Sequence, residues 1–366
     1  MKQTDITCDV CIIGSGPSAL IAGLLLNRNR DDYIIVGSKK YGELGNVHID
    51  GRKINILPMF PLRESTLTKM LFGQEVESFP SVKYYHVDKD DQPTDHLSQK
   101  VSADSFSEFA NKNGNLSLTL SYKLFGDIIF KQVLGELRSK VQHQYLSSTK
   151  KERLGFVNGK SLYMAVIEQE EERILRATVN EVDIHHRRVL MDSVSIAYNR
   201  LIVTIPLPSF LALSHLPQTF SFISSDSHFQ VYLSKSQLGT NELVYDCLLD
   251  SPVYRIFTPT ENVIVCQLAH NFSIYSRSII KNRVEQISST KIEEFGNPRT
   301  LKGAYPLQIS DSEERVKLAA TLYKEYGVML FGRFSYWKYT DLHELHWEGV
   351  YGPDSVQHKR NLESAQ

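Results

Sequence analysis

The sequence predicts an α/β fold in which a nucleotide-binding unit is combined with a separate antiparallel sheet. Residues 10–13 and 33–36 are apolar runs that flank a glycine turn and a stretch of small and apolar residues, the order strand, turn, helix, strand. Several strand-like runs recur between positions 220 and 268, as expected of an antiparallel sheet. A second glycine turn follows an apolar run near position 330. These observations indicate a Rossmann-type domain that the chain leaves and later re-enters.

The length and composition favour a compact protein of more than one domain. The chain has 366 residues, more than the roughly 250–300 at which single cores stop growing. Lysine and arginine number 41 against 42 for aspartate and glutamate, which gives no signature of a nucleic-acid partner. The apolar run at the start is too short to span a bilayer, and Asp5 and Asp9 stand where a signal peptide would be basic. We therefore expect a cytoplasmic protein that acts on a small molecule. The sequence does not indicate its oligomeric state.

Cysteine and histidine patterns favour structural roles. Four cysteines do not form a disulfide framework in a chain of this length. Cys8 and Cys11 lie three apart in an expected strand, so their side chains should point to opposite faces, and we predict buried thiols and no redox pair. His185 and His186 fall in an expected hairpin turn and should diverge, which argues against a metal site.

The first glycine turn, residues 14–19, has the composition of a dinucleotide-binding turn. Gly14 permits a tight turn, Gly16 lets the backbone approach a pyrophosphate, and Ala19 lets the helix pack near the strand. Ser15, Pro17 and Ser18 complete this turn. The acidic residue that usually binds the adenosine ribose should fall near position 37, but the chain reads Gly37-Ser38 there. The Ser38 hydroxyl could replace that carboxylate, or the ribose could be bound differently.

The rest of the chain alternates between the two domains. Helical patterns are expected at 159–169 and, after the capping-box pair Ser310 and Glu313, in a helix that ends at Gly327. Its expected apolar stripe is Val316, Ala319, Ala320 and Tyr323. Strands are expected at 177–184, 188–192, 201–205, 230–233, 242–249, 263–268 and 328–331. Pro206 and Pro208 should end the strand at 201–205. A terminal helix is expected near 342–347.

Read together, several segments resemble one clan of proteins. Gly14 to Ala19, Gly45-Asn46, residues 198–208 and Gly332-Arg333-Phe334 with Trp337-Lys338-Tyr339 are similar to motifs of the FAD-dependent amine oxidase, protoporphyrinogen oxidase and UDP-galactopyranose mutase clan. The resemblance implies a Rossmann-type FAD-binding domain, an antiparallel-sheet substrate domain and a partly helical insertion. The expected FAD-binding domain is discontinuous, and the insertion partly covers the site. The boundaries are 1–60, 151–210 and 325–350 for the FAD-binding domain, 61–150 for the insertion, 211–324 for the substrate domain and 351–366 for a polar tail.

The same resemblance implies further cofactor contacts. Val179 would lie by the adenine and Arg333 near the pyrophosphate and ribityl chain, while Gly45, Asn46 and Gly332 belong to the flavin-binding segments. The backbone at Leu342 and His343 would lie under the flavin pyrimidine edge, where a helix N-terminus stabilises negative charge on the reduced flavin.

The expected activity is an FAD-dependent oxidoreductase that dehydrogenates a small amine, amino-acid-like compound or related intermediate. No second dinucleotide motif for NAD(P)H is evident, so the substrate itself should supply the electrons. Residues 55–61 lack the glycine and histidines that mutase-like members carry beside the flavin, and His343 replaces an expected acid. Two alternatives stay open: a non-redox flavoenzyme of the sugar-nucleotide mutase type, and a degenerate flavin-binding partner protein.

No catalytic residue is assigned, but several side chains are candidates. Arg255 aligns with an arginine that often lies in the substrate cleft of similar proteins, and it could hold a carboxylate or phosphate or form an ordinary ion pair. Tyr305 and Tyr339 could form aromatic walls near the flavin or simply pack in the core. His48 could shuttle a proton or lie in an exposed loop.

Overall fold

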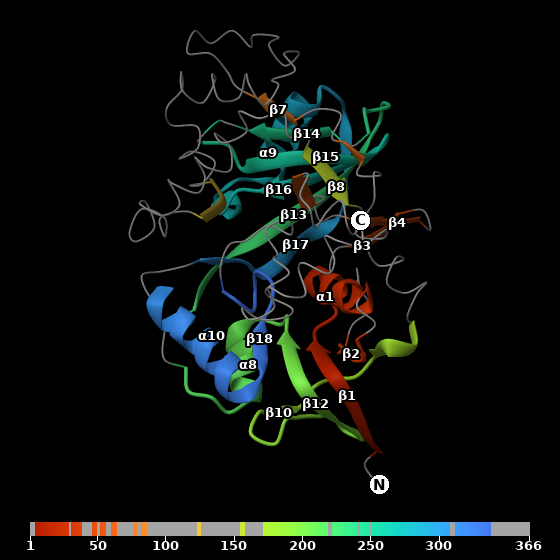
Figure 1. Ribbon diagram of the computed structural model, residues 1–366. Helices are drawn as coiled ribbons and strands as arrows, with labels where there is room; N and C mark the ends of the chain where they lie inside the picture. Colours follow the sequence, from red (N-terminus) through yellow and green to blue (C-terminus); the bar gives the residue numbers. More distant parts are fainter. Residues whose placement is uncertain are drawn as a thin grey trace.

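The computed structural model contains two large sheets in separate layers (Figure 1). The sheet that contains β1, β2 and β12 lies in the lower layer of Figure 1, and the sheet of β13 to β16 lies above it. The structure describes residues 4–28, 31–38, 46–49, 52–55, 60–63, 77–78, 82–85, 123–125, 154–157, 171–218, 222–240, 242–246, 248, 250–307 and 312–337.

The lower sheet is the predicted nucleotide-binding unit. Its core is β1 (Thr4–Ile13), α1 (Pro17–Arg28) and β2 (Tyr33–Val36), with β1 and β2 parallel. The strand order is β10-β11-β12-β1-β2-β9, and β18 also pairs with β12. The bounds of the added strands are β9 (Ile174–Leu175), β10 (Glu181–Asp183), β11 (Arg188–Leu190), β12 (Val194–Val203) and β18 (Val328–Leu330).

The return crossover is longer than the sequence predicts. A strand was expected at 201–205, whereas β12 starts at Val194 and pairs with β1 along its whole length. Its first part also pairs with antiparallel β11, and its last part with parallel β18. The tight turn at 184–187 joins β10 to β11, as expected for a hairpin. The strand ends at Val203, and the two prolines that follow it begin a helix. Pro206 is at the N-cap position of α8 (Leu207–Leu213), and Pro208 lies in the first turn of α8, where proline is tolerated.

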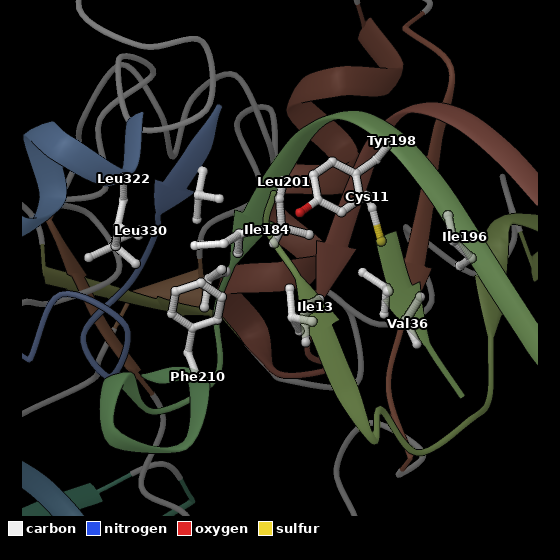
Figure 2. Packing of buried hydrophobic residues seen from close by; sticks show 14 of the residues in the cluster. Cys11, Ile13, Val36, Ile184, Ile196, Tyr198, Leu201, Phe210, Leu322 and Leu330 are labelled. Carbon is white, nitrogen blue, oxygen red and sulfur yellow. The ribbon is translucent and has the colours of Figure 1, made fainter. Parts of the chain in front are cut away.

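Apolar clusters cover both faces of this sheet. On one face α1 packs Leu20 and Leu25 against Val10, Ile12 and their neighbours. On the other face Phe210 of α8 and Leu322 of α10 (Ser312–Tyr326) belong to a second cluster with Ile13 (Figure 2). Burial on both faces explains why the ends of β1 and β12, residues 10–13 and 201–203, read as continuous apolar runs instead of alternating ones.

Two sequence predictions about side-chain direction differ from the structure in this domain. Of the stripe expected in α10, Ala319 and Tyr323 pack against the apolar clusters, whereas Val316 is 56% exposed and Ala320 is exposed. Leu322 is buried and Leu318 partly buried in their place, so the inward face is shifted from the one expected, because helix packing and not the apolar count sets it. Cys8 and Cys11 are buried thiols as predicted, but both belong to the same cluster and do not face opposite ways.

The upper sheet is predominantly antiparallel, with the order β17-β13-β16-β15-β14-β7. One of its faces packs against α9 (Arg277–Ser288) through Ile280, Val284 and Ile287. The strands are β7 (Val82–Tyr85), β13 (Ile223–Ser234), β14 (Glu242–Asp246), β15 (Val253–Thr260), β16 (Val263–Leu268) and β17 (Ile292–Leu307). Only β7 pairs in parallel, with β14.

The longest strand, β17, was not predicted from the sequence. It contains Gly296, Gly303 and Pro306, residues that normally break strands. Gly296 and Gly303 have φ values of 70° and 64°, and the pairing of β17 with β13 shifts register twice. Bulges absorb these breaks and let the strand continue.

Short strands within the expected insertion and on both sides of it pair in two small sheets. β3 (Asn46–Ile49) pairs with β4 (Arg52–Asn55), and β5 (Phe60–Arg63) and β6 (Glu77–Ser78) pair with β8 (Leu154–Val157). The helices expected at 159–169 and 342–347 lie outside the described residues. In the described part of the chain, no helix is long and apolar enough to cross a membrane.

A buried charge cluster joins residues 123–125 to the upper sheet. Asp246, at the end of β14, is fully buried and accepts two hydrogen bonds of 2.8 Å from Arg283 of α9. The Lys123 ammonium donates to the Asp246 backbone carbonyl at 2.7 Å and lies 3.8 Å from its carboxylate. Ser251 also donates to this carboxylate. The cluster holds α9 and residues 123–125 at the same end of the sheet.

Candidate functional site

The first glycine turn lies at the carboxyl ends of β1 and β2. Gly14 has a φ of 123°, and its N–H donates to the Val36 carbonyl at 2.7 Å. A Cβ on Gly14 would overlap the hydroxyl of Thr204, which itself donates to the Ile13 carbonyl at 2.8 Å. Both the backbone angle and the close approach of the crossover therefore require glycine at this position.

The turn leaves room for an anion at the start of α1. A Cβ on Gly16 would meet no atom within 4 Å, so this glycine is not required by protein packing. The first turn of α1 contains no acidic residue, and the first N–H groups of a helix have no partner inside it. Open space beside unsatisfied donors at the positive end of a helix fits a pyrophosphate.

Position 37, where an acidic residue is expected, holds a glycine for a steric reason. A Cβ there would lie 2.6 Å from the Ser15 Cβ, so any larger residue would displace the glycine turn. Ser38 is exposed at the end of β2. An acidic side chain at position 37 is therefore incompatible with Ser15 in this turn.

The second glycine turn packs directly on the first. Gly332 has a φ of 102°, and a Cβ on it would overlap the Ser18 hydroxyl of α1. The Phe331 N–H donates to the Val203 carbonyl at 2.9 Å, and the Leu207 N–H donates to the Phe334 carbonyl at 3.0 Å. The turn is thus fixed between α1 and the start of α8.

A row of polar side chains crosses the upper sheet on the face away from α9. Strand register sets Tyr245 opposite Arg255 and Arg255 opposite Gln267, so the three lie side by side on one face. Their sequence neighbours Val244, Ile256 and Cys266 belong to the cluster packed on α9. Alternation therefore directs the polar row away from that helix.

Arg255 is held within this row by hydrogen bonds and aromatic rings. Its Nε donates to Gln267 Oε1 at 2.7 Å, and its Nη1 donates to the Tyr245 hydroxyl at 3.1 Å. The guanidinium carbon lies 5.6 Å and 5.5 Å from the ring centroids of Tyr245 and Tyr254. None of these partners is a carboxylate, so the ion pair considered from the sequence is absent among the described residues, where dipoles and ring faces surround the charge of Arg255.

The polar row connects the two domains. Gln267 Nε2 donates to the Ser227 hydroxyl at 2.7 Å and to the Tyr305 hydroxyl at 3.0 Å. The Arg333 guanidinium, from the second glycine turn, lies 5.9 Å from the Tyr305 ring centroid. Phe125 meets the same ring edge-on, with centroids 5.6 Å apart. The polar face of the upper sheet therefore continues directly to the predicted cofactor turn.

No protein-family model and no curated protein matches the sequence. Reduced UDP-galactopyranose mutase superposes with a TM-score of 0.64 over 97% of this chain and 94% of its own, at 12% identity. A CLA-producing fatty acid isomerase from P. acnes gives 0.58 over 98% of both chains, at 13% identity. An Exiguobacterium protein taken to be a protoporphyrinogen oxidase gives 0.56 over 99% of this chain and 100% of its own, at 14% identity.

The chain has the fold of the amine oxidase clan. The likeness extends over nearly the whole length of both partners in each comparison, so it includes both sheets and not only the nucleotide-binding unit. The resemblance inferred from the glycine turns and the crossover is therefore confirmed at the level of fold.

The structure brings together some of the residues expected in the site of this fold. Residues 14–19 and Gly332 form one surface, and Arg333 joins it to Tyr305 and through Gln267 to Arg255. Val179 is partly buried beside the second cluster of the lower sheet. Asn46 and His48 lie in β3. Gly45, Tyr339, Leu342 and His343 lie outside the described residues. The cofactor contacts predicted for all of these stay predictions.

Sequence reasoning missed the residues that organise Arg255. Gln267 and Ser227 are nearly fully buried polar residues in strands that otherwise read as apolar or mixed. The one available signal was Gln267 in the apolar run Val263–Leu268, because a buried polar side chain must be hydrogen-bonded. In the described part of the chain, no three His, Cys, Asp or Glu side chains group in a way that could hold a metal.

Proposed function

We propose that the protein is an FAD-dependent oxidoreductase that dehydrogenates a small substrate carrying a carboxylate or phosphate, such as an amino-acid-like compound. The observation that carries this proposal is the continuous path from the glycine turns to the polar sheet face, through Arg333, Tyr305, Gln267 and Arg255. A cofactor-binding surface that meets a partly buried arginine with no carboxylate partner in the described part of the chain would offer both a redox group and an anion receptor.

The residues of the two glycine turns fit the pyrophosphate of FAD. The open space over Gly16 and the amides at the start of α1 would hold the phosphates, with Gly332 close by and Arg333 supplying positive charge. When bound, FAD supplies the acceptor for two electrons from a substrate C–H bond, and oxygen or another acceptor receives them afterwards. Gly37 and Ser15 leave the ribose end without a carboxylate, so affinity would depend mainly on the pyrophosphate and the flavin.

The upper sheet would bind and orient the substrate. Arg255 would hold an anionic group, while Tyr245, Tyr254 and Tyr305 present aromatic and hydroxyl surface around it. Phe125 and Tyr305 add apolar walls that exclude water. Holding one end of the substrate fixes the position of the other end relative to the cofactor, which is the main requirement for flavin-dependent oxidation.

A non-redox isomerisation is the second candidate. Two of the structures that share this fold are described as a mutase and a fatty acid isomerase, and anionic groups are also common in substrates of non-redox enzymes. The loss of mutase-like histidines in residues 55–61 favours the redox reaction. The two candidates differ in the oxidation state of the cofactor that supports turnover.

The deciding experiment begins with the absorbance spectrum of the purified protein and identification of any released chromophore. Released FAD would support the cofactor assignment, and an anaerobic screen of amino acids and related carboxylates would then follow. Bleaching of the flavin by a substrate supports the oxidoreductase. Turnover only after dithionite reduction supports the isomerase instead. Tight FAD retention without either response would support a flavin-binding partner protein, and failure to bind FAD would contradict the whole proposal.

A further inference from the structure

The polar row contains one side chain whose hydrogen bonds allow a single orientation. Gln267 Oε1 accepts from Arg255 Nε at 2.7 Å, and Gln267 Nε2 donates to Ser227 and Tyr305. Arginine nitrogens are always donors, so only the amide oxygen can face Arg255. The amide cannot flip without setting two donors against each other. Because Gln267 is only 2% exposed, water does not offer a substitute acceptor.

This fixed amide determines which part of Arg255 is presented to a ligand. Nε is used by Gln267, and Nη1 gives one hydrogen bond to Tyr245. For Nη2, no hydrogen bond is recorded to the described residues. The end of the guanidinium formed by the two Nη atoms therefore keeps three N–H donors, which matches the geometry needed to bind a carboxylate or phosphate bidentately.

We propose that Gln267 is a positioning residue for anion recognition, which holds Arg255 so that its Nη end faces the space in front of the sheet. The inference rests on the proposed function for the location of the anion, but the Gln267–Arg255 contact itself does not. Without the Gln267 acceptor, Nε would be a buried donor without a partner, and the guanidinium would turn to satisfy it. The Nη donors would then be lost to the ligand.

The chain offers a matched control on the same sheet. Gln230 of β13 is also buried, at 3% exposure, but its amide donates to backbone carbonyls, such as that of Val231 at 2.9 Å. Methionine has nearly the volume and flexibility of glutamine and no strong hydrogen-bonding group. Gln267→Met and Gln230→Met therefore each replace one buried amide by an apolar side chain of similar volume. Only Gln267 is hydrogen-bonded to Arg255.

The test uses the full-length FAD-loaded protein and inorganic phosphate as the probe anion. Phosphate affinity is measured from the change in flavin absorbance and by calorimetry, for the unchanged protein, Gln267→Met, Gln230→Met and Arg255→Lys. We expect Gln267→Met to weaken phosphate binding about ten-fold, as loss of an oriented charge-assisted contact would, and Arg255→Lys to weaken it at least as much. Gln230→Met should stay within about two-fold, because its hydrogen bonds lie outside the row.

A second readout reports the position of Arg255 without any ligand. In arginine-labelled protein, the Arg255 Nε–H signal, assigned by its loss in Arg255→Lys, should be protected from exchange. It should lose that protection in Gln267→Met and keep it in Gln230→Met. A purely structural role for Gln267 would lower stability in both methionine variants without this difference.

The possible outcomes separate this inference from the proposed function. If Arg255→Lys weakens phosphate binding and Gln267→Met does not, Gln267 is not a positioning residue, and the anion receptor stands. A different result would be that FAD is retained but phosphate does not bind, or that its affinity is the same in Arg255→Lys. The proposed anionic substrate would then be wrong, and the role of Gln267 in anion recognition would be overturned with it. Loss of exchange protection in that case would show only that Gln267 holds Arg255.

Discussion

Gly14 and Gly16 of the first turn serve different physical purposes, although both belong to the same dinucleotide-binding motif. Gly14 is required by its φ of 123° and by Thr204, whereas Gly16 has open space around its Cα. The first is a folding requirement, and the second makes sense only if something outside the chain approaches the backbone. Substitution can separate these two roles.

We expect Gly14→Ala to destabilise the protein by about 2–4 kcal/mol, through backbone strain and overlap with Thr204. Gly16→Ala should change the unfolding free energy of the FAD-free protein by less than about 1 kcal/mol and yet weaken FAD binding at least about ten-fold, because its methyl group fills the space for the pyrophosphate. Urea unfolding and FAD titration measure both quantities. Unchanged FAD affinity in Gly16→Ala would show that the open space is not the phosphate site.

A buried hydroxyl in the lower sheet makes a second prediction at this scale. Tyr198 is 4% exposed and lies in the apolar cluster shown in Figure 2, and its hydroxyl has no hydrogen-bond partner among the residues that the structure describes. Burial of this phenol raises its pKa, so it stays neutral. Tyr198→Phe should raise the unfolding free energy by about 1 kcal/mol, because an unsatisfied polar group is removed.

The matched control for that change is Tyr275→Phe. The Tyr275 ring is partly buried against the cluster under α9, and its hydroxyl makes an exposed hydrogen bond to the Asp250 carbonyl at 2.7 Å. The same substitution there removes a hydrogen bond and should be neutral or slightly destabilising. Chemical unfolding distinguishes the two, and a loss of stability in Tyr198→Phe would mean that the hydroxyl has a partner after all.

At the scale of elements, the docking of α9 depends on one buried carboxylate. Asp246 is shared by Arg283 of α9 and by Lys123, and both cations are nearly buried. Removal of one partner from a buried ion cluster leaves charge uncompensated. The cluster therefore couples a helix, a strand and a segment that is more than a hundred residues away in the chain.

Asp246→Asn should lower the unfolding free energy by about 3–5 kcal/mol. Glu293→Gln makes the same chemical change in the pair of Glu293 with Lys235, whose side chains are 64% and 59% exposed, and it should cost less than about 1 kcal/mol. Hydrogen exchange should show faster opening of α9 in the first variant alone. Equal effects of the two substitutions would contradict a structural role for the buried cluster.

For the whole molecule, contacts at the second glycine turn connect the two sheets. Trp337 donates from Nε1 to the Ile223 carbonyl at the start of β13, at 3.2 Å, and its ring meets Phe222. Arg333 lies over Tyr305 at the end of β17. Figure 1 shows β13 and β17 extending from the upper sheet toward the lower layer. We therefore expect the two sheets to unfold together.

Two buried thiols can test this expectation. Hydrogen bonding with Cys8 and burial raise the pKa of Cys11 in the lower sheet, and burial raises the pKa of Cys266 in the upper sheet. Both should resist thiol reagents until their sheet opens. Pulse labelling across a denaturant series, analysed by mass spectrometry, should give the same midpoint for both residues. Separate midpoints would mean that the sheets unfold independently.

The sequence by itself determined the first βαβ unit, the return to the same sheet and the fold class. Strong apolar runs and glycines with steric roles carry these features, since both are local properties of the chain. It did not predict β17, because Gly296, Gly303 and Pro306 are tolerated only where β13 provides bulged pairing. It also misassigned Val316 and Ala320 to the buried face of α10, which depends on the neighbours that the helix meets.

Only the tertiary structure decided how the candidate site is organised. The sequence offered Arg255 and Tyr305 as separate candidates fifty positions apart, and strand register and the Gln267 amide join them on one face. The tertiary structure also explained Gly37, since the obstacle to an acidic residue is Ser15 from another part of the turn. Hydrogen bonds between distant strands and steric contacts across a turn depend on pairing in space, and a linear pattern of residues does not encode that pairing directly.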